Sequence, residues 1–191
     1  MPTAGQLGNR NLIINGAMQV AQRGTSSTSS GYQTVDRFKQ YFTQVSVTQS
    51  RQELSSGSPY DEGFRFFVRM ANTSTSSSNA SQAEIQQRVE AQDLAQSGWN
   101  YKSTSSYVTF SFWARSSLAG TYYVTYRNSD ANPLQHIKSF TLAADTWTKV
   151  TQTIPGNSNV VFNNDNGTGL QIQIVLHYGT DLTGSGAQLN T

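Results

Sequence analysis

The chain contains no cysteine among its 191 residues, so disulfide bonds and cysteine-ligated metal sites are excluded. It has no apolar run near the roughly eighteen residues that a membrane-spanning helix needs. Charged residues make up only 13% of the sequence, and its thirteen Lys and Arg are scattered singly. Nucleic-acid-binding proteins usually gather their basic residues on one face or helix. We therefore expect neither a nucleic-acid partner nor insertion into a membrane.

The first apolar run is also short. Leu12, Ile13 and Ile14 form an apolar core of three residues, whereas a secretory signal peptide needs roughly seven and a basic leader before them. We predict that this run is a first β-strand rather than a signal. Asn15-Gly16, which follows it, is predicted to form a turn or bulge beside that strand.

Aromatic residues, by contrast, make up 11% of the chain, and Ser, Thr, Asn and Gln are abundant, which favours β-structure. Apolar and polar residues alternate with a period of two in several stretches, and this pattern predicts half-buried strands. The pattern is clearest over residues 64–70, 107–115, 121–127 and 169–178 and weaker over 41–47, 83–89, 138–142 and 147–154.

Turn-rich segments separate these strands, and the one helix-like stretch, residues 89–96, predicts a single short turn of helix. Short strands joined by such loops predict an all-β fold, an antiparallel sandwich or barrel. No internal repeat or linker is visible, so we predict one domain over residues 1–191. The turn-rich segments are residues 55–63, 72–81, 128–133 and 163–169.

Catalytic constellations are missing from the sequence. The two histidines, His136 and His177, have no nucleophile or carboxylate partner nearby in sequence. A glycosidase needs two carboxylates that flank the scissile bond. The nearest candidates are Glu84 with Glu90 and Asp61 with Glu62, and neither pair has supporting context. We therefore predict that the chain is not an enzyme.

A cofactor is not predicted either, although one segment holds several oxygen donors of the kind that calcium prefers. It lacks the spacing of a calcium-binding loop, and a plain turn rich in Asn and Gly explains it equally well. A structural calcium ion stays the less favoured alternative. The donors are Asn163, Asn164, Asp165 and Asn166.

A glycan-binding cleft requires flat aromatic faces beside polar side chains that hydrogen-bond to hydroxyl groups. The period-two pattern places one such set on the non-core faces of two strands that we expect to be adjacent, and two further aromatic residues lie near a loop. The alternative, which we favour, is that the aromatic side chains cover a sheet or pack against a neighbouring subunit, with Arg stacking on them. The strand set is Trp113, Arg115, Tyr123 and Arg127, the loop pair is Trp99 and Tyr101, and Gln86 and Arg88 share a face on a further strand.

Two phrases near the start, NLIINGAMQVAQRGTS and GYQTVDRF, closely resemble the opening of a family of bacteriophage tail-fibre and virion-associated proteins. EIQQRVEA, VTFSFWAR, GTYYVTYRN and DTWTKVTQTIPG then follow in order. Together these phrases are similar to the strands of jelly-roll carbohydrate-binding modules of the galactose-binding-like class. The resemblance covers residues 9–156, and the opening phrase is its most specific part.

The resemblance implies a jelly-roll β-sandwich in a structural virion protein of a tailed phage, found in the virion as a tail-fibre or appendage module. It implies assembly with other virion proteins, a homo-oligomer that is commonly a trimer, and a host-surface glycan as a further partner. Two alternatives remain, a capsid decoration or head-fibre protein and a carbohydrate-binding module of a larger enzyme. Asn11, Leu12, Ile13 and Ile14 are the expected attachment residues, and deletion of residues 1–20 is expected to abolish incorporation while the sandwich stays folded.

Members of this family usually continue beyond a segment like IQIVLHYGTDLTGSG, residues 172–186, and supply a further strand. The chain is therefore expected to be either shorter than its relatives or the N-terminal piece of a longer fibre. If a strand is missing, we expect a neighbouring subunit to cover the exposed sheet edge, because unpaired edges recruit partners.

Overall fold

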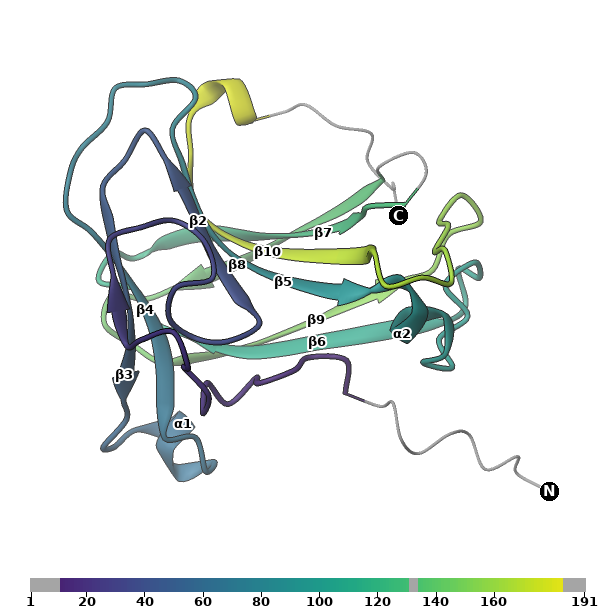
Figure 1. Ribbon diagram of the computed structural model, residues 1–191, viewed down its shortest axis with the longest axis horizontal. Helices are drawn as coiled ribbons and strands as arrows, with labels where there is room; N and C mark the ends of the chain where they lie inside the picture. Colours follow the sequence, from purple (N-terminus) through teal and green to yellow (C-terminus); the bar gives the residue numbers. More distant parts are fainter. Residues whose placement is uncertain (1–10, 131–133, 184–191) are drawn as a thin grey trace.

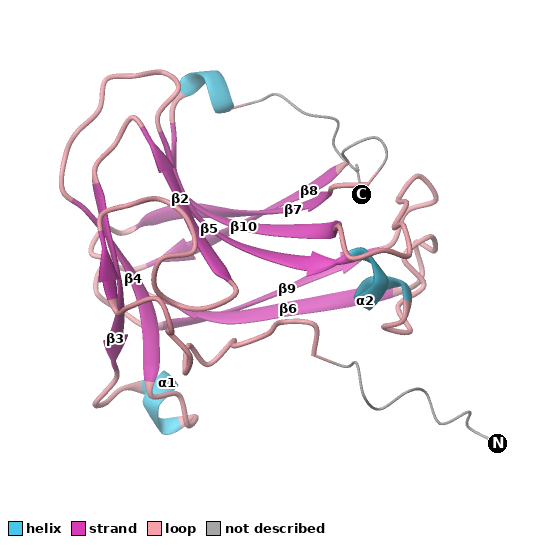
Figure 2. Ribbon diagram, viewed as in Figure 1, coloured by secondary structure: helices cyan, strands magenta, loops and turns pink. Residues whose placement is uncertain are grey.

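The computed structural model describes residues 11–130 and 134–183, so part of the predicted loop 128–133 lies outside the described residues. Within these ranges the chain is mostly β-structure with little helix (Figure 1, Figure 2). The strands are β1 Ser26–Ser27, β2 Phe38–Thr43, β3 Val47–Glu53, β4 Phe66–Asn72, β5 Gln82–Glu90, β6 Tyr107–Ala114, β7 Gly120–Asn128, β8 Gln135–Leu142, β9 Thr148–Pro155 and β10 Thr168–Tyr178, and the helices are α1 Ser58–Asp61, α2 Ala91–Ala95 and the 3₁₀ turn η2 Thr180–Leu182.

Two layers of antiparallel strands form a sandwich, which confirms the predicted fold class. The larger layer is a five-stranded sheet in the order β2-β5-β10-β7-β8, and the smaller layer is the pair β6-β9. A third sheet, β1-β3-β4, stands at one end of these layers (Figure 1). From β5 onward the chain passes repeatedly between the two layers, as in a jelly roll. Strands that neighbour each other in a sheet are therefore seldom neighbours in sequence.

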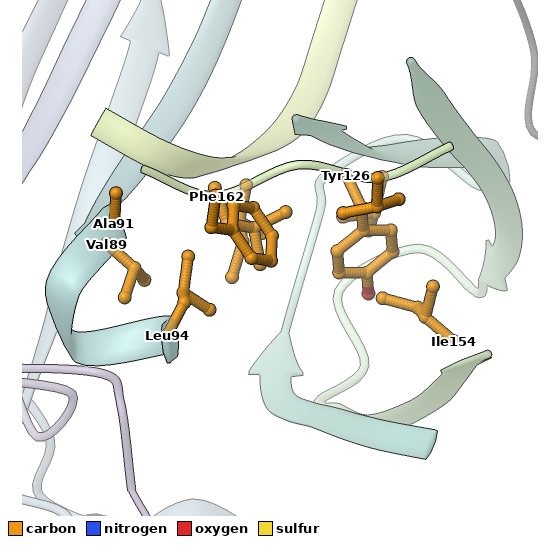
Figure 3. Close-up of a cluster of buried hydrophobic side chains, with 10 residues drawn as sticks. Val89, Ala91, Leu94, Tyr126, Ile154 and Phe162 are labelled. Carbon is orange, nitrogen blue, oxygen red and sulfur yellow. The ribbon is translucent and has the colours of Figure 1, made fainter. Parts of the chain in front are cut away.

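The hydrophobic core lies between the two layers. Val124 and Tyr126 of β7, Ile172 of β10 and Ile154 of β9 belong to one buried cluster. Leu94 of α2 lies at one end of this cluster, and Tyr126 and Ile154 lie at the other (Figure 3). Burying an apolar side chain of this size contributes about 1.5–3 kcal/mol, so this cluster is a main source of stability.

Helix α2 covers the beginning of β10 at very short range. A Cβ atom placed on Gly169 would lie 2.7 Å from the Cα atom of Ala91. Glycine is therefore required at this position for α2 to lie where it does. The helix spans five residues, in agreement with the single short turn that the sequence predicts over residues 89–96.

The predicted first strand at Leu12–Ile14 is wrong. Residues 11–13 have no regular secondary structure, and a turn follows at residues 14–17 in which Asn15 has a φ of 58°. Leu12 and Ile13 pack against the core instead, beside Val108 of β6. The physical reason is the width of the smaller layer, because two strands cannot cover a five-stranded sheet. The N-terminal segment fills the uncovered side.

The turn itself, at Asn15-Gly16, agrees with the prediction. The Asn15 side chain donates to the carbonyl oxygens of Val20 and Asp36 at 2.9 Å each, and its Oδ1 accepts from the Val20 amide at 3.0 Å. A short amide side chain that satisfies the backbone around it is a common way to hold a left-handed turn residue.

The predicted strand over residues 41–47 is also wrong as a single element. β2 ends at Thr43 and β3 begins at Val47, and Gln44 between them has a φ of 57°. The segment is thus the turn of a hairpin with a strand end on either side. The alternation of residue types continues through this turn without Gly, Pro or Asn, which are the residues that normally signal a turn.

Candidate functional site

The candidate site is the face of the five-stranded sheet that points away from β6 and β9, which we call the outer face. Alternate residues of its strands, such as Val124 and Ile172, pack into the core, so the intervening residues lie on the opposite face. The strand registers arrange those residues in three rows across the sheet. The rows are Tyr41–Glu84–Val175–Tyr123, Lys39–Gln86–Gln173–Thr125 and Arg88–Gln171–Arg127.

A buried carboxylate lies at the centre of the outer face. Glu84 is only 2% exposed although it points away from the core. Gln173 Nε2 donates to both of its carboxylate oxygens, 2.9 Å from each. Gln86 Nε2 and the Tyr178 hydroxyl donate to it as well. A buried charge is costly unless it is hydrogen-bonded, and here three neutral side chains from β5 and β10 supply the hydrogen bonds.

Tyr178 is held as a hydrogen-bond donor in this network. Burial, together with the negative charge of Glu84 and the hydrogen bond to it, raises the pKa of Tyr178 above its usual range, although Arg127 opposes the shift. The hydroxyl therefore stays protonated at every physiological pH. The network is a rigid polar platform in the middle of the sheet.

Cationic side chains surround this platform. The terminal guanidinium nitrogen Nη2 of Arg88 donates to Gln86 Oε1 at 3.3 Å, and its Nε atom is buried with no hydrogen-bond partner in the described part of the chain. Lys39 Nζ lies 4.8 Å from the centre of the Tyr41 ring. Burial and the charge of Arg88 lower the pKa of Lys39, and Glu84 partly offsets this effect. The ion pairs of the described residues include none with Lys39, Arg88 or Arg127.

Half of the predicted strand set for a glycan cleft comes together on this face. Tyr123 and Arg127 both lie on its β7 portion, and Gln86 and Arg88 lie on β5. The Tyr123 side chain is 47% exposed, so its ring is available for contact.

Trp113 and Arg115 do not join this group, because the expectation that their strand neighbours residues 121–127 is wrong. Across the described ranges β6 pairs with β9 and with no other strand. Trp113 Nε1 donates to Glu62 Oε2 at 3.1 Å, and Arg115 forms an ion pair with Asp145 at 3.1 Å. Both side chains thus contact their own chain on the smaller layer.

Trp99 and Tyr101 also lie away from the outer face. Both rings pack against Phe162, with centroid distances of 6.2 and 4.7 Å. Trp99 Nε1 donates to the carbonyl oxygen of Ser106 at 3.3 Å. These aromatic residues extend the hydrophobic core at one end of the sandwich.

The four expected attachment residues divide between the core and the surface. Leu12 and Ile13 pack against the core, and Asn11 Oδ1 accepts a hydrogen bond from the Ile13 amide at 3.0 Å. Ile14 is 47% exposed, so it is the apolar side chain of the four that a partner can reach. The cavity beneath this segment measures about 70 Å³, whereas small-molecule pockets usually measure roughly 300–1,000 Å³. This cavity is therefore too small for a small-molecule ligand.

The two histidines have separate surroundings. His177 Nε2 lies 2.7 Å from Ser81 Oγ. His136 is buried, and burial, followed by the charge of Lys138, lowers its pKa. Glu84 and Glu90 lie six residues apart on β5, which corresponds to about 20 Å along a strand. This exceeds the roughly 5–9.5 Å between glycosidase carboxylates.

The Asn-rich segment at 163–166 forms a turn in which Asp165 Oδ1 accepts a hydrogen bond from the Gly167 amide at 3.0 Å. No group of three His, Cys, Asp or Glu side chains suited to a metal ion occurs in residues 11–130 and 134–183. Over the same ranges, no helix is long and apolar enough to cross a membrane.

Sequence reasoning missed the roles of Glu84, Lys39 and Tyr41 in this site. The alternation of residues in FKQYF and EIQQR contained the necessary signal, because it places all three on the polar side of their strands. What it did not indicate is that β2 and β5 are neighbours.

No family model and no curated protein sequence matches the chain. Among solved structures, it is similar to the enzymatically active domain of tailspike protein 4 of bacteriophage CBA120, with 12% sequence identity and a TM-score of 0.49. The match covers 88% of this chain and 20% of that one, so the chain spans a fifth of the length of the tailspike domain.

Proposed function

We propose that the chain is a structural module of a tailed-phage appendage, such as a tail fibre, and that it binds a host-surface glycan through the outer face. It acts by non-covalent assembly and binding rather than by catalysis. The resemblance of the sequence over residues 11–38 to phage tail-fibre proteins supports the virion assignment. The observation that carries the binding assignment is the outer face, where exposed Tyr123 shares a sheet face with hydrogen-bonded amides and with cations that form no ion pair within the described residues.

The chemistry of the outer face suits an oligosaccharide. Tyr123 offers a flat ring on which a sugar can stack, and Gln171 and Arg127 offer donors to hydroxyl groups. The row from Tyr41 to Tyr123 crosses three strand spacings, which is about 14 Å. This length accommodates a short chain of sugars rather than a single sugar.

Assembly is proposed to use other surfaces. Ile14 and Val20 are exposed apolar side chains of the N-terminal segment, and they suit contact with another virion protein or a sister subunit. A homotrimer is the expected oligomer from the family resemblance. Antibody labelling of purified phage particles tests the location, and labelling at the capsid would replace the tail appendage with a head-fibre role.

A glycan array with the purified chain tests the binding assignment. We expect saturable binding that Tyr123→Ala weakens by about tenfold or more, because loss of a buried stacking contact costs roughly 1.5 kcal/mol. Trp113→Ala is the matched aromatic control on the smaller layer and should bind as the unaltered chain does.

Two results would overturn this assignment. One is the absence of saturable binding to any bacterial surface glycan. The other is binding that Trp113→Ala abolishes and Tyr123→Ala leaves unchanged, which would move the site to the β6–β9 layer. A carbohydrate-binding module of a larger enzyme predicts the same array result, so the particle labelling separates it from a virion protein.

A further inference from the structure

We infer that the outer face selects glycans that carry acidic groups, and that Arg88 and Arg127 receive those groups. The inference rests on the proposed glycan-binding function. It adds the chemical class of the ligand, a sugar chain with a carboxylate or phosphate on its repeating unit.

The charge on the outer face leaves an unpaired positive excess. Lys39, Arg88 and Arg127 are cationic and have no ion-pair partner within the described ranges. Glu84 is the carboxylate among them, and both of its oxygens accept hydrogen bonds from neutral side chains. The three rows therefore hold two more positive than negative charges. An acidic ligand is complementary to this surface.

The two arginines are placed to act together. Arg88 and Arg127 are both register partners of Gln171, one on each side of it. They are thus two strand spacings apart, or about 10 Å between Cα atoms. Guanidinium groups bind carboxylates and phosphates through paired hydrogen bonds. Two such groups at this spacing suit acidic units on two sugars of one chain.

Arg88 is held in place and still has donors to offer. Gln86 donates to Glu84 through Nε2, which orients its amide so that Oε1 accepts from Arg88 Nη2. The buried carboxylate thus positions Arg88 through one intervening side chain. The Nε atom of Arg88 is buried without a partner in the described structure. A ligand cannot reach a buried atom, so an acidic group would bind the terminal nitrogens of this half-buried side chain.

The smaller layer differs in this respect. Its cations, Lys149 and Arg115, already form ion pairs with Glu62 and Asp145. An acidic ligand there would have to displace a carboxylate of the chain. Arg115 is therefore the matched control for the two arginines of the outer face.

Isothermal titration of the full chain with oligogalacturonate and with its carboxyl-reduced, neutral counterpart tests the inference. We expect the acidic oligosaccharide to bind about tenfold more tightly, because one charge-assisted hydrogen-bonded pair contributes roughly 1.5 kcal/mol. Arg88→Gln and Arg127→Gln should each lower the affinity for the acidic form far more than the affinity for the neutral form, and so remove most of this preference. Arg115→Gln should change neither affinity. Thermal unfolding of each variant shows whether it is folded.

A second titration, with phosphomannan, a polysaccharide that carries phosphate, distinguishes the source of the acidic group. Arginine-dependent binding of this polymer but not of oligogalacturonate assigns phosphate, and the reverse assigns carboxylate. Either result supports the inference.

Three results overturn it. Equal affinity for the acidic and neutral forms removes the acidic selectivity and leaves the proposed glycan binding intact. Single-stranded DNA that binds as tightly, with the same dependence on Arg88 and Arg127, indicates general attraction of polyanions. Absence of binding to every glycan, the neutral ones included, removes the proposed function as well.

Discussion

The outer faces of the two layers contain similar residue types but differ in whether their cationic side chains form ion pairs. On the smaller layer, Lys149 lies 2.9 Å from Glu62 and Arg115 lies 3.1 Å from Asp145. On the five-stranded sheet, Glu84 accepts its hydrogen bonds from neutral side chains, and the cations around it form no ion pair with any residue in 11–130 or 134–183. The two surfaces therefore differ in ion pairing rather than in composition. Cations that already pair with carboxylates of the chain are less available to a ligand than cations without such a partner.

The layers also differ in width, and this difference explains the N-terminal segment. Two strands leave part of a five-stranded sheet uncovered, and Leu12 and Ile13 fill that side. The expectation that residues 1–20 can be deleted without loss of the fold is therefore revised. Removing residues 11–13 exposes apolar core beside β6, so a loss of incorporation after that deletion would not by itself indicate a docking role.

The largest expected effect is on the network of the five-stranded sheet. Glu84→Ala removes the acceptor of three buried donors, and unsatisfied buried groups cost 1–3 kcal/mol each, so we expect the free energy of unfolding to fall by about 3 kcal/mol. Urea denaturation measures it. Glu84→Gln keeps the shape and one acceptor and should lose less. If Glu84→Ala lowered the free energy of unfolding by less than about 1 kcal/mol, the hydrogen-bond network around Glu84 would not be a main support of the sheet.

The next effect concerns the uncovered side of the smaller layer. Leu12→Ala should lower the free energy of unfolding by about 1.5 kcal/mol, because it leaves a gap beside a half-buried site. Ile14→Ala, two residues away, should stay within about 0.5 kcal/mol because the side chain is exposed. Urea denaturation measures both variants. Equal losses of unfolding free energy would contradict the role of Leu12 in covering the core beside β6.

A smaller effect is expected for the contact between the layers. The Tyr126 hydroxyl of β7 donates to Gln152 Oε1 of β9 at 2.8 Å, and the residue is 2% exposed. Tyr126→Phe removes this bond and should cost about 1 kcal/mol, seen as a lower Tm. Tyr107→Phe, at a side chain of β6 that is 60% exposed, is the control and should have no effect. An unchanged Tm for Tyr126→Phe would mean that the hydrogen bond between Tyr126 and Gln152 makes no net contribution to stability.

The smallest effect is expected on the outside of the smaller layer. Hydrogen bonds from Lys149 and Trp113 lower the pKa of Glu62, but this carboxylate is exposed, and exposed ion pairs contribute little and are screened by salt. Glu62→Gln should therefore change stability too little to resolve at 0.5 M NaCl. If denaturation showed a loss like that of Glu84→Ala, the contrast between the two outer faces would not hold.

Most strands were predictable from residue alternation, and the reason is visible in β6 and β10. Val108, Phe110 and Phe112 alternate with polar residues and reach the core, as do Leu170 and Ile172. The hairpin at Gln44 was not predictable in this way, because alternation continues across it. Leu12 and Ile13 were assigned to a strand because apolar packing against a core leaves the same local pattern as a buried strand.

The sequence by itself determined which side chains share a face, and it placed Tyr123 with Arg127 and Gln86 with Arg88. Only the tertiary structure decided which faces lie side by side. A period of two records the two sides of one strand and contains no information about its neighbour across the sheet. The pairing of β6 with β9 therefore separated Trp113 from Tyr123, and the position of β10 between β5 and β7 brought Arg88 and Arg127 to either side of Gln171.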